Sequence, residues 1–181
     1  MTNYRVDTLE LGTFTTESGE TINNLKLRFE HVGYSGQPLV VVCHALTGNH
    51  LTYGTDEKHG WWREIIDGGY IPRHDYQFLT FNVIGSPFGS SSKLNDLNFP
   101  QHLTLRDIVK AIEKGIKALG FEKINILIGA SLGGMQAMEL LYNNQFQIDK
   151  AIILAATGKT SSYSRAFNEI ARQAIHLGGK E

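Results

Sequence analysis

Apolar and polar residues alternate along the first part of the chain, in two segments that flank a turn. The alternating apolar positions in residues 5–15 are Leu9, Leu11 and Phe14, and those in residues 24–32 are Leu25, Leu27 and Phe29. Such alternation is typical of a strand with one buried face. The sequence Glu17-Ser18-Gly19-Glu20 between the segments suits a turn. The pattern therefore predicts a half-buried antiparallel hairpin.

From Pro38 onward, the alternation gives way to short runs that are apolar at almost every position. There are four such runs, at residues 39–43, 78–83, 124–128 and 151–156. A continuous apolar run of this length is typical of a strand that is covered on both faces, as strands of a parallel sheet are. We therefore expect a core of at least four buried parallel strands.

Helical signals lie between these runs. Thr104 can cap a helix whose third position is Asp107, close to the capping-box pattern, and Gly120 stands where that helix should end. The apolar positions at helical spacing in this segment are Ile108, Ile112, Ile116 and Leu119. Two further helices are predicted at residues 132–143 and 162–177, and a short one near Trp61-Trp62.

Strands and helices thus alternate along most of the chain. This order is typical of right-handed crossovers that build a doubly wound sheet. The predicted fold class is α/β, with a mostly parallel doubly wound sheet and an antiparallel N-terminal hairpin. Residues 1–181 are expected to form one domain, or part of one, because the chain has 181 residues with 41% hydrophobic and 19% charged residues.

Composition narrows the classes of partner. The formal net charge is -1 and no block of Lys and Arg occurs, so nucleic acid is not expected to bind. No apolar stretch reaches the roughly 18 residues that span a bilayer, and the opening residues lack the pattern of a secretory signal. Cys43 is the single cysteine and cannot form an internal disulfide, which suits a reducing compartment. A cytoplasmic location is expected.

The strongest chemical signal is the sequence Gly129-Ala130-Ser131-Leu132-Gly133-Gly134, a G-x-S-x-G motif between a predicted strand and a predicted helix. A nucleophile elbow is a sharp strand-to-helix turn that exposes a serine, and the flanking glycines prevent collisions with the adjacent strand and helix. The motif indicates Ser131 as a nucleophile. The alternative is a plain tight turn in which Ser131 only caps the helix.

Two backbone N–H groups are candidates for an oxyanion hole. The N–H of Leu132 follows the serine directly and belongs to the start of a helix, where N–H groups are free. The second candidate is the N–H of Leu46, in the turn that follows the strand at residues 39–43. His44 is expected to be a structural histidine at the strand end, and Cys43 to be a core residue, because consecutive strand side chains point to opposite faces.

A serine nucleophile needs a base and an orienting acid, and in this type of fold both follow it in the chain. His176 is the single histidine after Ser131, and the candidate acids are Asp149, Glu169 and Glu181. We expect His176 to lie on a helix surface, and none of the three acids stands in a convincing loop. The triad therefore looks incomplete, which predicts that the chain is the first part of a longer catalytic domain.

Other motifs give weaker evidence of function. The histidines at positions 50, 59, 74 and 102 lack the spacing of metal ligands, so no metal site is expected. The segment from Gly85 to Ser92 follows a predicted strand but contains neither of the two glycine-rich phosphate-binding motifs, which leaves nucleotide binding of those types unsupported.

Longer matches surround the serine motif. They are His44-Ala45-Leu46-Thr47-Gly48, Gly60-Trp61-Trp62, Phe81-Asn82-Val83-Ile84-Gly85, Leu105-Arg106-Asp107-Ile108-Val109, Gly129 through Ala137, and Ala166 through Ile175. In these segments the chain resembles the N-terminal part of the homoserine O-acetyltransferases, which are acyltransferases of methionine biosynthesis with an α/β-hydrolase fold. The segments after Val83 and after Ile175 differ from the family pattern, which affects substrate detail.

The resemblance implies a ping-pong reaction. Ser131 would take an acetyl group from acetyl-CoA, a co-substrate rather than a bound cofactor, and pass it to the hydroxyl of L-homoserine, with Leu46 and Leu132 N–H groups holding the oxyanion. The family's Asp and His, and the arginine that binds the homoserine carboxylate, would lie beyond Glu181, and Arg172 is not assigned to that role. A homodimer is a further expectation from the family.

Three alternatives stay open. One is a serine ester hydrolase, in which water attacks the acyl-serine. A second is a homoserine O-succinyltransferase of the same family. The third is that the 181-residue chain is a portion that folds only with a partner segment, which predicts an exposed apolar sheet edge and poor solubility.

Overall fold

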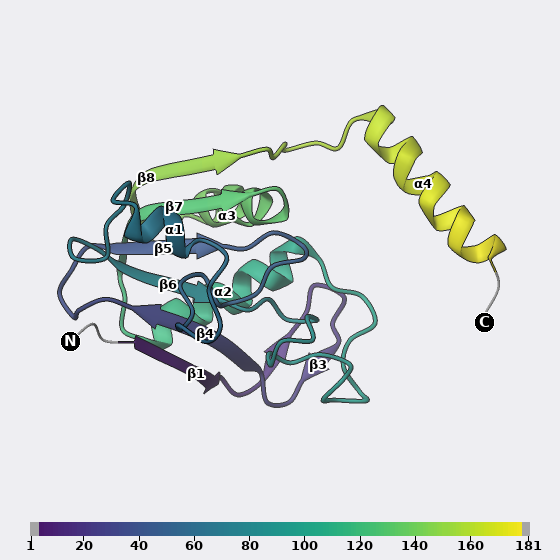
Figure 1. Cartoon of the computed structure of the whole chain (residues 1–181). Helices are drawn as coiled ribbons and strands as arrows, with labels where there is room; N and C mark the ends of the chain where they lie inside the picture. Colours follow the sequence, from purple (N-terminus) through teal and green to yellow (C-terminus); the bar gives the residue numbers. More distant parts are fainter. Residues whose placement is uncertain (1–3, 179–181) are drawn as a thin grey trace.

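The continuous apolar runs form the centre of one six-stranded sheet in the computed structural model, which describes residues 4–178. The strand order is β1-β4-β6-β5-β7-β8 (Figure 1). The strands are β1 (Tyr4–Glu10), β4 (Lys26–Val32), β5 (Leu39–Cys43), β6 (Gln77–Phe81), β7 (Lys123–Ala130) and β8 (Gln147–Leu154). β6, β5, β7 and β8 are parallel, and β4 joins β6 antiparallel. The predicted mostly parallel sheet is confirmed.

The predicted N-terminal hairpin is also confirmed, with one refinement. β1 and β4 pair antiparallel from Tyr4↔Val32 to Glu10↔Lys26. Beyond this register the chain forms a separate two-stranded sheet, in which β2 (Phe14–Thr15) pairs with β3 (Thr21–Ile22) around the predicted turn. The long hairpin is thus divided into two sheets, and its far end is free to pack against a helix.

Two helices cover one face of the large sheet, α2 (Leu105–Ala118) and α3 (Leu132–Asn143). α2 begins at the predicted capping box, in which the Thr104 side chain accepts from the Asp107 N–H and the Asp107 side chain accepts from the Thr104 N–H. It ends at Ala118, and Gly120, just after the C-cap residue Leu119, has a φ of 80°, the left-handed conformation that glycine adopts readily. Both ends of this helix follow from the sequence.

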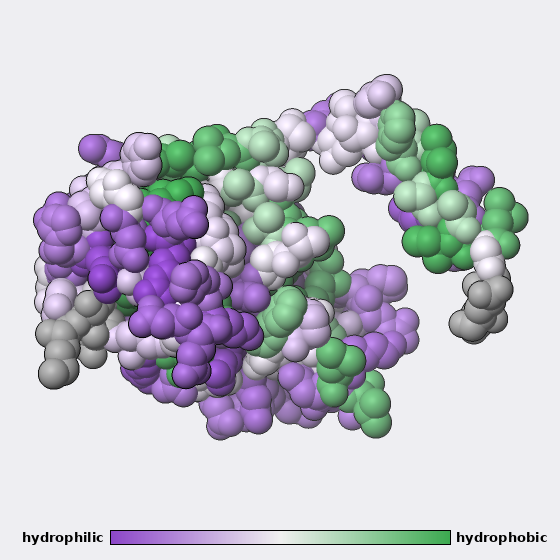
Figure 2. Space-filling model, in the orientation of Figure 1, coloured by the Kyte–Doolittle hydropathy of each residue, from purple (hydrophilic) through white to green (hydrophobic). Residues whose placement is uncertain are grey.

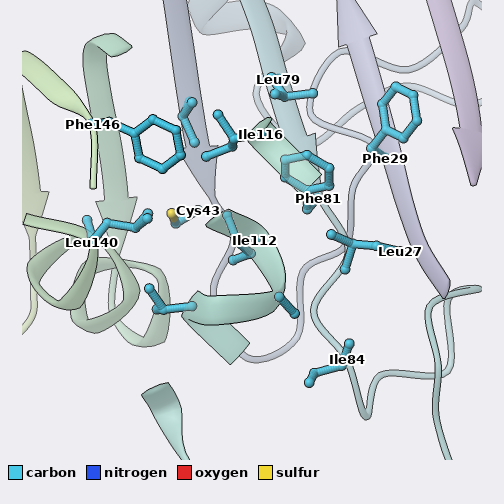
Figure 3. Packing of buried hydrophobic residues seen from close by; sticks show 14 of the residues in the cluster. Leu27, Phe29, Cys43, Leu79, Phe81, Ile84, Ile112, Ile116, Leu140 and Phe146 are labelled. Carbon is cyan, nitrogen blue, oxygen red and sulfur yellow. The ribbon is translucent and has the colours of Figure 1, made fainter. Parts of the chain in front are cut away.

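The main core lies between these helices and the sheet (Figure 3). Ile112 and Ile116 of α2 point toward Leu79 and Phe81 in that view, and Leu140 of α3 lies beside Phe146. Gly115 permits the close approach of α2, because a Cβ there would lie 2.7 Å from side-chain atoms of Leu27 and Phe81. The helical periodicity of residues 105–118 is therefore explained by burial of one helix face.

A second, smaller core covers the opposite face of the sheet. Along the strands, the residues that face this core alternate with those that face the main core. The short helix α1 (Arg63–Asp67) covers them with its buried Ile66. The buried residues of this cluster are Val32, Val40, Val42, Tyr53, Ile66, Phe78 and Ile128. Layers on both faces explain why the strand sequences are continuous apolar runs. The short helix begins after Trp62, slightly later than the tryptophan pair suggested.

The expectation that the fourth run is buried on both faces is wrong. β8 is one of the two edge strands of the sheet, with β7 as its neighbour, and the side chains of Ile152 and Leu154 are 39% and 48% exposed. α3 contacts one face of β8, but among residues 4–178 nothing covers the other. An apolar strand sequence shows that the strand can be buried on both faces. Whether it is buried depends on its position in the sheet.

Helix α4 (Ser162–Leu177) forms where it was predicted, with the Ser161 hydroxyl as its N-cap, but none of its residues is buried. Figure 1 shows it projecting beyond the sheet, and Figure 2 shows apolar side chains along both α4 and β8. Tyr163 and Phe167 contact each other on this helix, with ring centroids 4.7 Å apart. Between residues 4 and 178, no helix has both the length and the apolar character needed to cross a bilayer.

Candidate active site

Ser131 stands at a sharp turn between β7 and α3. Its φ of 54° and ψ of -122° lie in a region that residues with a side chain rarely adopt. Two hydrogen bonds hold this conformation: the Ser131 N–H donates to the Leu154 carbonyl at 3.0 Å, and the Ser131 carbonyl accepts from the Met135 N–H at 3.1 Å. The side chain is exposed at the carboxyl end of β7. This is the geometry of a nucleophile elbow.

The glycines of the motif are required by close contacts. A Cβ on Gly129 would lie 2.1 Å from the Gly133 carbonyl oxygen, and a Cβ on Gly133 would lie 2.0 Å from the Cys43 carbonyl oxygen. A Cβ on Gly134 would meet the Cβ of Ala156 at 2.5 Å. The start of α3 therefore packs directly on its neighbouring strands. A plain turn with a capping serine would not need this packing, and the Ser131 side chain makes no capping hydrogen bond in α3.

The two candidate oxyanion donors lie on adjacent strands. Cys43 of β5 pairs with Gly129 of β7, so the segments that leave these strands emerge side by side. Leu132 is the first residue of α3, and Leu46 lies in a turn closed by the Gly48 N–H donating to the Ala45 carbonyl at 2.9 Å. Among the described residues, neither of the two N–H groups has an acceptor. Both are free to bind an anion.

His44 is a structural histidine, as expected. Its Nδ1 lies 2.8 Å from the Ala45 carbonyl, and its Nε2 accepts from the Val83 N–H at 3.2 Å. Because Nε2 accepts, the proton must be on Nδ1, and both nitrogens are occupied by backbone groups. Burial lowers the pKa of His44, which favours this neutral form. Cys43 is a core residue, and burial raises the pKa of its thiol to about 12.

The remaining candidates for proton transfer do not gather around Ser131. Asp149 lies near the start of β8, at the amino end of the parallel strands and away from Ser131, and its carboxylate is 2.8 Å from Lys123 Nζ. Glu169 is paired with Arg172 on the exposed helix α4, and His176 lies in the last turn of that helix. Glu181 lies outside the described residues. Arg172, which was not assigned to binding the homoserine carboxylate, forms a surface ion pair with Glu169.

Sequence reasoning missed one polar residue at the site, Gln136. It is fully buried in α3, and its Nε2 donates to the His44 carbonyl at 3.2 Å. The available signal was a glutamine on the side of α3 that also carries Gly133 and Ala137, where an apolar residue would be expected. Within residues 4–178, no group of three His, Cys, Asp or Glu side chains could hold a metal ion.

This fold and serine site match a known class of protein. Residues 38–177 match the family model for the alpha/beta hydrolase fold. The chain belongs to this family. A solved esterase, E22, shares the fold at a TM-score of 0.78 with 23% sequence identity, over 98% of this chain and 54% of that one.

More specific similarities point to one group within the family. The chain is 82% identical to a homoserine O-acetyltransferase from Staphylococcus aureus of known structure, with a TM-score of 0.94 over 98% of this chain and 54% of that one. It is 34% identical to the homoserine O-acetyltransferase of Methanobrevibacter ruminantium over 97% of this chain and 40% of the relative. It is 36% identical to the homoserine O-acetyltransferase of Citrifermentans bemidjiense, over 96% of this chain and 53% of the relative.

The resemblance to homoserine O-acetyltransferases is thereby confirmed. The chain spans about half the length of these relatives, between 40% and 54%. Whether a catalytic histidine and aspartate lie beyond Glu181 stays a prediction.

Proposed function

We propose that this chain supplies the nucleophile and the oxyanion hole of a homoserine O-acetyltransferase. The observation that carries the proposal is the strained, exposed Ser131 beside two free N–H groups, in a chain 82% identical to an enzyme of that name. The fold alone would equally suit an esterase, so the donor and acceptor assignments depend on the sequence similarity.

The reaction has two halves. Ser131 Oγ attacks the thioester carbonyl of acetyl-CoA while its proton passes to a histidine base, which the proposal places beyond Glu181. The carbonyl oxygen becomes an oxyanion held by the Leu46 and Leu132 N–H groups, and the C–S bond then breaks as the CoA sulfur takes the proton. In the second half, the hydroxyl of L-homoserine attacks the acetyl-serine, gives up its proton to the same base, and releases O-acetylhomoserine as Ser131 recovers its hydrogen.

The proposal includes a cellular setting. It places the protein in methionine biosynthesis in the cytoplasm, with acetyl-CoA and L-homoserine as small-molecule partners and a homodimer as the assembly. The similarity to homoserine O-acetyltransferases supports the two small-molecule partners.

The test is the intact mass of the complete protein before and after mixing with acetyl-CoA. We expect one acetyl adduct that disappears when L-homoserine is added, and no adduct in Ser131→Ala, whose turnover should fall by on the order of 10⁴ or more. Succinyl-CoA in place of acetyl-CoA distinguishes the succinyltransferase. An adduct that decays in water at the same rate with and without homoserine would identify a hydrolase instead.

A further inference from the structure

Gln136 occupies a position where an amide is costly. Its side chain is fully buried, and its Oε1 has no hydrogen-bond partner among the described residues. A buried polar atom without a partner destabilises a fold, and an apolar side chain of similar length would fill the same space without that cost. The one polar contact that Gln136 makes is the bond from Nε2 to the His44 carbonyl at 3.2 Å. Packing therefore does not account for the amide.

This hydrogen bond joins helix α3 to the turn that follows β5, and each of them carries one of the two oxyanion donors. Gln136 belongs to α3, the helix that begins with the Leu132 N–H and follows Ser131. His44 begins the turn that carries the Leu46 N–H. The two backbones already approach closely, because a Cβ on Gly133 would lie 2.9 Å from the His44 carbonyl oxygen. The Gln136 amide donates the hydrogen bond that links this helix to the turn. No other side chain among residues 4–178 joins them by a hydrogen bond.

Peptide geometry explains what the link controls. In a planar trans peptide the C=O and N–H point in opposite directions. The Ala45 carbonyl is held by the Gly48 N–H and by His44 Nδ1, so the Leu46 N–H must point away from both. The preceding peptide, which carries the His44 carbonyl, is held by Gln136. Successive peptides on the way to Leu46 are thus fixed by hydrogen bonds.

We propose that Gln136 is a positioning residue, which sets the direction of the Leu46 N–H through the carbonyl of His44 and so aligns the two oxyanion donors. The proposal rests on the proposed function of Ser131 as a nucleophile. Gln136 itself does not touch the reacting atoms.

The first experiment measures how firmly the hydrogen bonds of the turn are held, independently of activity. Amide hydrogen exchange of the complete protein is compared between wild type and Gln136→Met, a variant of similar length without a donor. The reporters are the Gly48 and Val83 N–H groups, whose acceptors belong to the turn and to the His44 ring. We expect both to exchange at least about tenfold faster in the variant, while the β7 amides stay unchanged. Unchanged exchange at both reporters would overturn the proposal.

The second experiment measures acylation in the complete protein, with p-nitrophenyl acetate as the probe. The burst amplitude counts competent sites, and the burst rate constant reports transition-state stabilisation. We expect Gln136→Met to keep the amplitude and to lower the rate constant by about 10- to 100-fold, less than the loss of a donor itself. The control is Leu140→Val, a buried change on the same helix away from the turn, which should not alter the rate constant. A reduced amplitude with a normal rate constant would mean a structural role and would refute the proposal.

Gln136→Glu provides a rescue test. A protonated carboxyl can donate to the His44 carbonyl, whereas a carboxylate cannot. The acylation rate constant of this variant, divided by that of wild type at the same pH, should therefore rise as the pH falls, and the ratio cancels the titration of the base. A ratio independent of pH would count against the proposal. A wild-type protein without any burst would refute the proposed function, while hydrogen exchange would still decide the role of Gln136.

Discussion

The serine turn illustrates how single atoms constrain this protein. Ser131 has an unfavourable backbone conformation, and its neighbours leave no room for it to relax. Such strain persists when surrounding contacts over-determine it. Gly133 is the tightest of these contacts, since its α-carbon faces the Cys43 carbonyl directly.

Gly133→Ala should therefore be strongly destabilising. The added Cβ would lie 2.0 Å from the Cys43 carbonyl oxygen, a backbone atom that cannot move without displacing β5. We expect the free energy of unfolding, measured by urea denaturation, to fall by about 1–3 kcal/mol or more. Gly158→Ala is the matched control, because nothing lies within 4 Å of a Cβ there. Equal stability of the two variants would contradict this account of the turn.

His50 should make stability depend on pH. Its side chain is 7% exposed, and burial, with a further contribution from Arg28, lowers its pKa to about 4. The unfolded chain takes up a proton near pH 6.5 whereas the folded chain does not, so stability is full above about pH 6.5 and declines as the pH falls toward 4, by less than about 1.4 kcal/mol for each pH unit. His44, whose pKa is also lowered, adds to the same trend.

The measurement is the free energy of unfolding at pH 7 and at pH 4.5 in wild type and in His50→Gln. The variant should lose less stability between the two pH values, because it lacks the buried imidazole. His102→Gln, which changes an exposed histidine, should behave as wild type. The idea fails if both variants show the same dependence on pH.

At the scale of elements, the start of α2 is a junction rather than an isolated cap. The buried carboxylate of Asp107 accepts from the Thr104 N–H at 3.0 Å and from the Glu17 N–H at 2.8 Å. The second of these bonds joins the helix to the turn between β2 and β3. The capping pattern was readable from the sequence, but the link to residue 17, which lies 90 positions away, was not.

Asp107→Ala should cost more than a typical cap substitution. It removes a fully buried carboxylate that accepts from two N–H groups, one of them in a different element. We expect a loss of about 1–3 kcal/mol in the free energy of unfolding, measured with urea. Glu57→Ala, an exposed carboxylate in a loop, should change stability by less than about 0.5 kcal/mol. A similar loss in both would argue against the junction.

At the scale of the whole molecule, the chain divides into a packed body, residues 4–158, and an arm, residues 159–178. The body runs from β1 to β8, where Ile148 and Ile153 of β8 pack against the main core while Ile152 and Leu154 are exposed. The arm contains helix α4, which buries no residue. Figure 2 shows apolar side chains on β8 and on α4, with a more polar stretch between them. The apolar side chains of β8 agree with the exposed sheet edge expected of a chain that needs a partner segment.

Removal of residues 159–181 should leave the body unchanged. α4 has no buried residue, and an isolated helix of 16 residues is marginal in water, so the arm contributes no packing free energy. The urea midpoint and the slope of unfolding should match those of the whole chain, with a difference below about 0.5 kcal/mol. A loss above about 1 kcal/mol would show that α4 docks on the body.

Much of this protein is determined locally by its sequence. Hydrophobic period, the capping residues of α2 and the glycines around Ser131 act over a few residues, and each was sufficient to predict its strand, helix or turn. Tertiary structure alone decided that β8 lies at an open edge, that both His44 nitrogens bind backbone groups, and that Gln136 reaches the turn of Leu46. These features depend on which distant segments become neighbours, because burial and hydrogen-bond partners are properties of the packed fold rather than of any short segment.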